Sequence, residues 1–207
     1  MTEANSRADA APADAATKTL LLIDGSSYLY RAFHSPAGSK WEATLPDGRT
    51  VRTGALRIMI NMLGALKKKY PAAYCACVFD APGPTFRDEI YPKYKATRSP
   101  MPDELRAQIE PIHEACQLLG WNVVHMPGVE ADDVIGTLAC MASAQGIEVV
   151  ISSGDKDLSQ LVDQHITVID TMNDKRRDQF IATLRQWQIE RGLFLAAINR
   201  CGRCRRH

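Results

Sequence analysis

Three stretches of this chain are apolar at nearly every position, and this pattern restricts the fold more than any other feature of the sequence. They cover residues 19–23, 74–79 and 146–151. A strand that is apolar on both faces must be covered on both, as happens when helices flank a parallel sheet. Shorter strands are predicted at 121–125 and 166–169, which gives five strands in chain order.

Helical segments alternate with these strands. Apolar residues recur at helical spacing over residues 53–69, and further helices are predicted over 103–119 and 131–144, with a short one at 158–162. Residues 28–50 are mixed in character and contain loop signals. Strands that alternate with helices predict the α/β class, with a central, mostly parallel sheet flanked by helices.

Acidic residues follow three of the predicted strands and open one helix. Because sites in parallel sheets form outside the carboxyl ends of the strands, we expect these side chains to meet at one edge. One or two acids complement the start of a helix, but a third adds repulsion. The full set consists of Asp24, Asp80, Glu130, Asp132, Asp133, Asp155 and Asp157.

Such a cluster predicts a site for a hard divalent cation, Mg²⁺ or Mn²⁺, because carboxylate oxygens are the ligands that these ions prefer. Any one of the acids taken alone is commonly a turn or cap residue, and Asp157 could cap the helix that follows it. Four separate segments that deliver acids to one edge are hard to explain as caps. A phosphatase or phosphoacceptor site, with Lys156 and Ser152 as helpers, is a weaker alternative.

A basic segment follows the second acidic strand end. Residues 91–100 contain three cations, two tyrosines and no acid. Alone, such a segment is most simply a solvated basic face. Beside a carboxylate metal site it predicts nucleic-acid binding, since phosphodiester hydrolysis needs both a clamp for the polyanion and metal-activated water.

The bulk composition is that of a soluble globular protein, with 45% hydrophobic and 24% charged residues in 207 and a net charge of +1. No apolar run is long enough to span a membrane. Residues 1–17 lack the features of a signal peptide and are predicted to be a disordered tail. Six cysteines without a signal peptide favour a reducing cytoplasm, and the pairs Cys75/Cys77 and Cys201/Cys204 do not have the spacing of a zinc site.

Six motifs together resemble the 5′–3′ exonuclease domain of bacterial DNA polymerase I, a member of the flap-endonuclease family. They appear in the family's order as LIDGSSYLYRA at 22–32, VFDA at 78–81, TFRDE at 85–89, YKATR at 94–98, GVEADDVIGT at 128–137 and SGDKD at 153–157. The resemblance implies a PIN- or resolvase-like nuclease fold with a helical arch. It also divides the chain into a tail (1–17), a catalytic domain (18–172) and a divergent, helical and Arg-rich end (173–207).

The resemblance implies a role for each site residue. Asp24, Asp80, Glu130 and Asp132 would hold a first metal ion, Asp155 and Asp157 would belong to a second, and Asp133 would lie near or between them. Lys95 and Arg98 match basic residues near the scissile phosphate. The residues implied in holding DNA are Arg31, Arg87, Tyr94, Lys95 and Arg98. The implied partner is DNA with 5′ flaps or 5′ ends, cut by a monomer during replication and repair.

The sequence departs from the family pattern near its end. The family completes its second metal site with two further aspartates roughly 45 residues after the position of Asp157, where this chain has an Arg-rich end at 200–207. We therefore expect a truncated or frame-shifted product with an incomplete second metal site. The alternative function is a catalytically impaired DNA-binding fragment, or an inert one.

Overall fold

The computed structural model describes residues 18–97, 99–171 and 175–177. At its centre lies β1 (Thr19–Asp24), which pairs in parallel with β4 (Tyr74–Val78) on one side and β6 (Glu148–Ser152) on the other. The six-stranded sheet has the order β5-β4-β1-β6-β7-β8. Its outer strands are β5 (Asn122–Val124), β7 (Ile166–Asp170) and β8 (Lys175–Arg177), of which only β8 runs antiparallel. The predicted mostly parallel sheet is confirmed.

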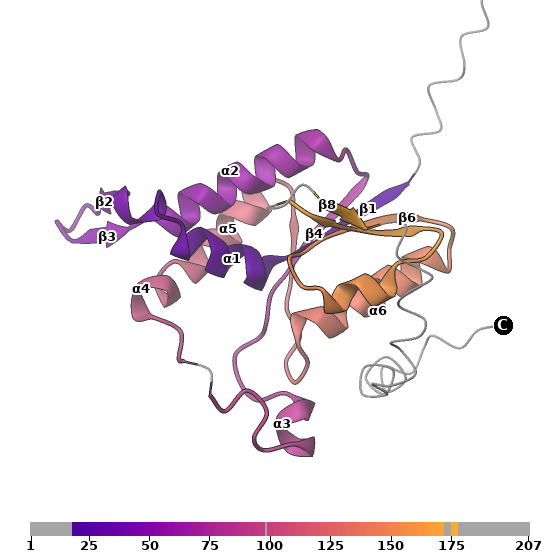
Figure 1. Cartoon of the computed structure of the whole chain (residues 1–207). Coiled ribbons are helices and arrows are strands. Elements are labelled where there is room, and N and C mark those ends of the chain that lie inside the picture. The colour runs from indigo at the N-terminus through magenta and orange to yellow at the C-terminus, as the bar shows by residue number, and fades with distance from the viewer. Residues whose placement is uncertain (1–17, 98, 172–174, 178–207) are drawn as a thin grey trace, which may run out of the picture.

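Successive residues of β1 pack on opposite faces of the sheet, which explains why its sequence is continuously apolar. Leu21 and Ile23 are fully buried against one layer, and Leu22 is fully buried against the other. The first layer contains α1 (Gly25–His34), α2 (Gly54–Lys69) and α5 (Ile109–Leu118). The second layer is α6 (Ala131–Ser143), seen on the other side of the strands in Figure 1.

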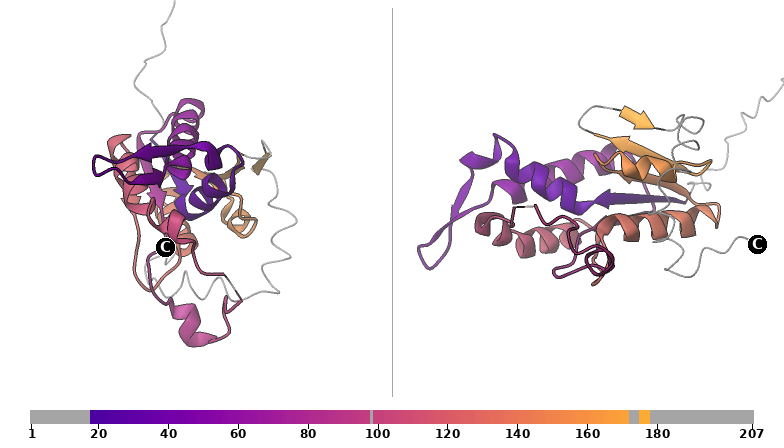
Figure 2. Two further views of the ribbon diagram at one scale, coloured as in Figure 1. Left: turned by 90° about the vertical axis from the view of Figure 1, so that its left-hand side faces the viewer. Right: turned by 60° about the horizontal axis from the view of Figure 1, so that its bottom comes forward.

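The region 28–50 is more regular than its mixed sequence predicts. Helix α1 starts directly after Asp24, whose carboxylate accepts a hydrogen bond from the Ser27 N–H at 2.9 Å and so caps it. A short η1 turn (Gly38–Lys40) leads into a hairpin of β2 (Glu42–Thr44) and β3 (Thr50–Arg52). Figures 1 and 2 show this hairpin projecting beyond α1 and α2.

The single helix predicted over 103–119 is wrong, because the chain forms α4 (Asp103–Arg106) and then α5. Pro111 explains the break, because a proline inside a helix has no N–H to donate and its ring clashes with the carbonyl four residues earlier, here that of Ala107. Gln108 lies at the break, and its buried side chain accepts hydrogen bonds from the N–H groups of Ala55 and Leu56 at the start of α2. Pro111 then falls in the first turn of α5, where its missing N–H has no partner to lose.

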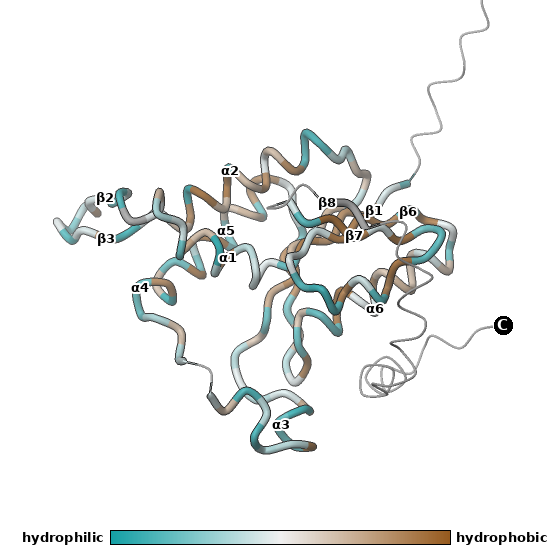
Figure 3. Tube along the Cα trace, in the orientation of Figure 1, coloured by the Kyte–Doolittle hydropathy of each residue, from teal (hydrophilic) through white to brown (hydrophobic). Residues whose placement is uncertain are grey.

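Between β4 and α4 the chain leaves the sheet in a projecting segment, residues 81–97, which contains the short helix α3 (Phe86–Ile90). Figure 3 shows hydrophobic strands at the centre and mostly hydrophilic residues in the projecting segment and the hairpin. The short helix predicted at 158–162 is the 3-10 turn η2 (Asp157–Leu161). No helix among the described residues has the length and apolarity to cross a membrane. The predicted tail at 1–17 and helical end at 173–207 lie outside the described residues, apart from β8.

Candidate active site

The carboxyl ends of β1, β4 and β6 and the start of α6 form one edge of the sheet, which we call the acidic edge. Asp24 is the last residue of β1 and is only 6% exposed. One of its oxygens caps α1, and the other, Oδ2, accepts a hydrogen bond from the Ser153 hydroxyl at 2.7 Å. Burial raises the pKa of Asp24, and the charges of Asp80 and Asp155 raise it further, against the effect of its hydrogen bonds.

Asp80 follows β4 and joins that strand to two helices. Its Oδ1 accepts a hydrogen bond from the Ala131 N–H at 2.8 Å, at the first residue of α6. Its own N–H donates to the Ser26 hydroxyl at 2.8 Å, in the first turn of α1. Asp80 is therefore held between the starts of α1 and α6, with its side chain exposed.

Asp132 lies in the first turn of α6, among the other acids. Its pKa is raised to about 7, first by burial and then by the charges of Asp24, Asp155, Asp80 and Glu130. Asp132 and these four acids, five of the seven carboxylates predicted from the sequence, are therefore close enough for their charges to act on Asp132.

The two other acids at the start of α6 have basic or backbone partners. Glu130 N–H donates to Asp133 Oδ2 at 3.2 Å, which is half of a capping box. Arg87 makes two hydrogen bonds to Asp133, one of them Nη2 to Oδ1 at 2.7 Å, and its Nη1 lies 3.7 Å from a Glu130 oxygen. Asp133 thus faces the projecting segment.

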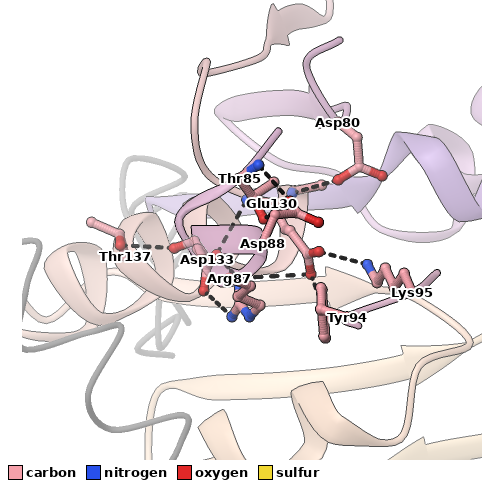
Figure 4. A network of polar contacts seen from close by, with 10 residues as sticks. Asp80, Thr85, Arg87, Asp88, Tyr94, Lys95, Glu130, Asp133 and Thr137 are labelled. Atoms are coloured by element: carbon pink, nitrogen blue, oxygen red, sulfur yellow. Dashed lines mark hydrogen bonds and ion pairs between the residues drawn. The ribbon is translucent and has the colours of Figure 1, made fainter. Parts of the chain in front are cut away.

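The projecting segment contacts Glu130 directly (Figure 4). Lys95 Nζ lies 2.6 Å from Glu130 Oε1, and the Tyr94 hydroxyl donates to Oε2 at 3.2 Å. Lys95 has a φ of 53°, and it is the only residue other than glycine with positive φ in the described part of the chain. Backbone conformations of this kind are concentrated at functional sites. Arg98 lies outside the described residues.

Arg31 is placed at the β6–β7 end of the acidic edge. Its guanidinium lies 4.8 Å from the centre of the Tyr28 ring, and Nη1 donates to the Thr171 hydroxyl at 3.3 Å. The Tyr28 hydroxyl is hydrogen-bonded to Ser152 at 2.6 Å. Of the predicted DNA-binding residues that the structure describes, Arg31 lies on α1, whereas Arg87, Tyr94 and Lys95 lie in the projecting segment.

Asp155 and Asp157 follow β6 in an exposed loop. The Asp155 N–H donates to the Ser153 hydroxyl at 3.0 Å, and the Asp157 N–H donates to Asp155 Oδ1 at 2.8 Å. Asp157 begins η2 and does not cap it with its side chain. The expected alternative role of Asp157 as a cap is therefore not seen.

The donor chemistry of the acidic edge suits a hard divalent cation. All seven predicted ligands are carboxylates. Burial first, and then the charges of neighbouring acids, raise the pKa values of Asp24 and Asp132, and a bound cation would offset both effects. Within the described residues, however, no three acidic, histidine or cysteine side chains are already arranged to hold one ion. Glu130 and Asp133 face basic side chains instead. The metal-ligand set therefore stays a prediction.

Two serines at the acidic edge were missed by sequence reasoning. Ser26 accepts the Asp80 N–H, and Ser153 links Asp24 to Asp155. The signal was present, because each serine lies within two residues of a strand end, in the stretches GSS and SSG. A hydroxyl beside an acid does not by itself reveal its partner, so only the fold assigns these contacts.

Comparisons with known proteins agree with the motifs. Residues 19–188 match the family described as 5′–3′ exonuclease, N-terminal resolvase-like domain. DNA polymerase I of Pseudomonas aeruginosa is 53% identical over 159 residues, which are 77% of this chain and 17% of that protein. A 5′–3′ exonuclease of Aquifex aeolicus is 42% identical over 158 residues, which are 76% of this chain and 53% of that protein. The chain thus spans about half of this exonuclease and a smaller share of the polymerase.

Solved structures show the same fold. Bacteriophage T5 5′-exonuclease with bound zinc has a TM-score of 0.55 at 20% identity, over 80% of this chain and 60% of that one. T5 flap endonuclease in a pseudo-enzyme–product complex with DNA and metal ions has a TM-score of 0.55 at 18% identity, over 86% and 62%. The family match covers most of this sequence. It excludes the phosphatase or phosphoacceptor site that was the weaker alternative from the sequence. The chain belongs to the family of 5′–3′ exonuclease N-terminal, resolvase-like domains.

Proposed function

We propose that this chain carries the catalytic carboxylates of a metal-dependent 5′–3′ exonuclease and flap endonuclease that hydrolyses DNA phosphodiesters. The observation that carries the proposal is the direct contact of Lys95 and Tyr94 with Glu130. The contact supports the proposal because Lys95 and Tyr94 are the proposed clamp for a polyanion, and Glu130 is one of the proposed oxygen donors. Both are required for metal-assisted cleavage of a phosphodiester.

Asp24, Asp80, Glu130 and Asp132 are the residues that would hold a first Mg²⁺ or Mn²⁺, and Asp155 and Asp157 would contribute to a second. When bound, such ions polarise the phosphodiester and lower the pKa of a coordinated water. Support comes from the metal ions named in the T5 structures and from the excess of carboxylate charge at the acidic edge. Asp133 is bound by Arg87, so we propose that it lies beside the metal ligands and is not itself one of them.

Lys95 and Arg31 would bind the phosphates on either side of the cleaved bond. Both side chains now have partners within the protein, Lys95 on Glu130 and Arg31 on Thr171. A phosphate can replace the Glu130 carboxylate as the partner of Lys95 because both are anions. A metal ion held by Glu130 would compete with Lys95 for the same carboxylate and would leave the Lys95 ammonium to pair with a phosphate. Tyr94, beside Lys95, offers a ring on which a base can stack.

The biological setting is proposed from the relatives. DNA polymerase I and 5′–3′ exonucleases among them support removal of 5′ flaps and primers during DNA replication and repair. We propose that the chain acts as a monomer in the cytoplasm and leaves a 5′-phosphorylated product.

A flap-cleavage assay tests the function. The purified chain is incubated with a labelled 5′-flap DNA in Mg²⁺ or in Mn²⁺, beside the variants Asp132→Ala and Glu148→Ala. Glu148 is an acid at the start of β6, the opposite end of that strand from the acidic edge, so its replacement is the matched control. We expect metal-dependent cleavage that Asp132→Ala abolishes and Glu148→Ala leaves intact.

The same assay separates the two functions considered from the sequence. Binding of flap DNA without cleavage in either metal would support a non-catalytic DNA-binding fragment. Neither binding nor cleavage would contradict both. Cleavage that survives Asp132→Ala would show that the nuclease activity does not arise from the acidic edge.

A further inference from the structure

We infer that Ser153 is a positioning residue that couples the buried Asp24 carboxylate to the loop that carries Asp155 and Asp157. The inference rests on the proposed function, because it concerns how the proposed metal ligands are held. Ser153 follows β6 and is 1% exposed. It lies between the acids proposed for the first metal ion and those proposed for the second.

The directions of its two hydrogen bonds follow from chemistry. The Asp155 backbone N–H, 3.0 Å from Ser153 Oγ, can only donate, so the serine oxygen accepts that bond. The serine hydroxyl has one hydrogen, and Asp24 Oδ2 lies 2.7 Å away as an acceptor. Ser153 Oγ therefore accepts a hydrogen bond from the loop, and its hydroxyl donates one to the Asp24 carboxylate.

These contacts fix the orientation of Asp24. Its Oδ1 is held by the Ser27 N–H and its Oδ2 by Ser153, so each oxygen has one directional bond. The charges of Asp80 and Asp155 act on the carboxylate that is held in this way. Partners of this kind orient a ligating carboxylate and tune its affinity for a metal ion.

The same serine anchors the exposed loop to the sheet. Its own N–H donates to the Ile169 carbonyl of β7 at 3.1 Å, which sets its position. From Ser153 the bonds continue to Asp155 and then, through Asp155 Oδ1, to the Asp157 N–H. One continuous series of hydrogen bonds thus joins Asp24 to both loop acids, and removal of the hydroxyl breaks it in the middle.

The neighbouring Ser152 is a matched control. It is fully buried, as Ser153 nearly is, and its hydroxyl makes a hydrogen bond of 2.6 Å to the Tyr28 hydroxyl. Ser152→Ala and Ser153→Ala each remove one buried hydroxyl with a hydrogen bond. Only the second removes a bond to a carboxylate of the acidic edge.

The test measures binding of Mn²⁺ to the full chain by calorimetry, without DNA. We expect Ser153→Ala to weaken binding by about 10-fold to 100-fold, as replacement of such partners does in metal sites. Ser152→Ala should bind Mn²⁺ nearly as wild type does, and Ser153→Thr, which keeps the hydroxyl, should restore most of the affinity. In flap cleavage, Ser153→Ala should lower kcat with little change in KM for DNA, because Lys95 and Arg31 are untouched.

Thermal unfolding in EDTA shows whether each variant folds. Equal Mn²⁺ affinity in wild type and folded Ser153→Ala would overturn the inference while leaving the proposed nuclease in place. An equal loss in Ser152→Ala, or no recovery in Ser153→Thr, would also overturn it. If the wild-type chain binds no Mn²⁺ and cuts no flap, both the inference and the proposed function are wrong.

Discussion

Asp132 is an acid whose surroundings oppose its charge. Burial and the neighbouring carboxylates raise its pKa to about 7 in the folded chain, from 3.8 in an unstructured one. Between these two values the folded state holds a proton that the unfolded state has released. Folding stability therefore falls as pH rises from about 4 to about 7 and then levels off, which is the reverse of the behaviour of a salt-bridged acid.

Asp132→Asn removes the contribution of Asp132 to the pH dependence of folding stability. Each pKa unit corresponds to about 1.4 kcal/mol, so we expect the variant to be more stable than wild type at pH 8, by up to a few kcal/mol. At pH 4 the difference should largely vanish, because Asp132 is then protonated when folded and near its own midpoint when unfolded. Urea unfolding in EDTA at the two pH values measures both differences.

A suitable control for this prediction is Asp103→Asn on α4, whose side chain is fully exposed. Because Asp103 lies on α4 and not among the acids of the acidic edge, its replacement should not reproduce the gain that Asp132→Asn shows at pH 8. The prediction for Asp132 is wrong if its asparagine variant gains nothing at pH 8 relative to pH 4.

At the scale of elements, α2 and η1 approach each other so closely that a side chain does not fit. A Cβ on Gly54 would lie 1.8 Å from the Gly38 carbonyl oxygen. We expect Gly54→Ala to lower the free energy of unfolding by about 2 kcal/mol or more, since the backbones must separate. Gly64, in the same helix, has open space around its Cβ position. Gly64→Ala should therefore raise stability by about 0.5–1 kcal/mol, and denaturant unfolding of the two variants compares them directly.

The projecting segment is joined to α6 by the ion pair between Arg87 and Asp133. The two side chains are only 18% and 11% exposed. Arg87→Met leaves Asp133 buried without its cation, and we expect a loss of about 3–5 kcal/mol. The double variant Arg87→Met/Asp133→Leu should recover part of this loss, and a double-mutant cycle in EDTA measures the coupling. Cleavage within residues 91–97 by a protease should become faster in Arg87→Met.

The exposed ion pair of Arg52 and Glu104 serves as the control for the coupling energy between Arg87 and Asp133. Its side chains are 48% and 54% exposed, so the same cycle should give at most about 1 kcal/mol. A coupling for Arg87 and Asp133 as small as this one would show that the pair does not hold the projecting segment.

How much of this could be predicted differs from element to element. The buried strands were predictable because Leu21, Leu22 and Ile23 must each be covered, whichever face they lie on. The meeting of the strand-end acids at one edge then follows from the geometry of a parallel sheet. The break after α4 was signalled by Pro111, which is tolerated only in the first turn of a helix. The contact of Gln108 with N–H groups of α2 more than fifty residues earlier was not predictable. The role of Ser153 depends in the same way on Asp24, which is brought to it only by the pairing of β1 with β6.

Over the whole molecule, a net charge of +1 hides a separation of charges. Acids gather at one edge of the sheet, and the projecting segment brings Arg87 and Lys95 onto two of them. These two cations neutralise Glu130 and Asp133 only. Asp24, Asp132 and the loop acids keep a repulsion that acts against folding, and a bound divalent cation would remove it.

Divalent cations should therefore stabilise the full chain, and more so than an equal ionic strength of NaCl, which screens charges without occupying a site. A cation at about 100 times its Kd adds about 2.7 kcal/mol, which corresponds to roughly 5–10 °C in Tm for a domain of this size. Thermal unfolding in MnCl2, in MgCl2 and in matched NaCl measures the effect. Asp24→Asn should abolish most of it, whereas Glu148→Gln, at the opposite edge, should not. If NaCl raises Tm as much as MnCl2 does, the cations act by screening alone and the acidic edge is not a metal site.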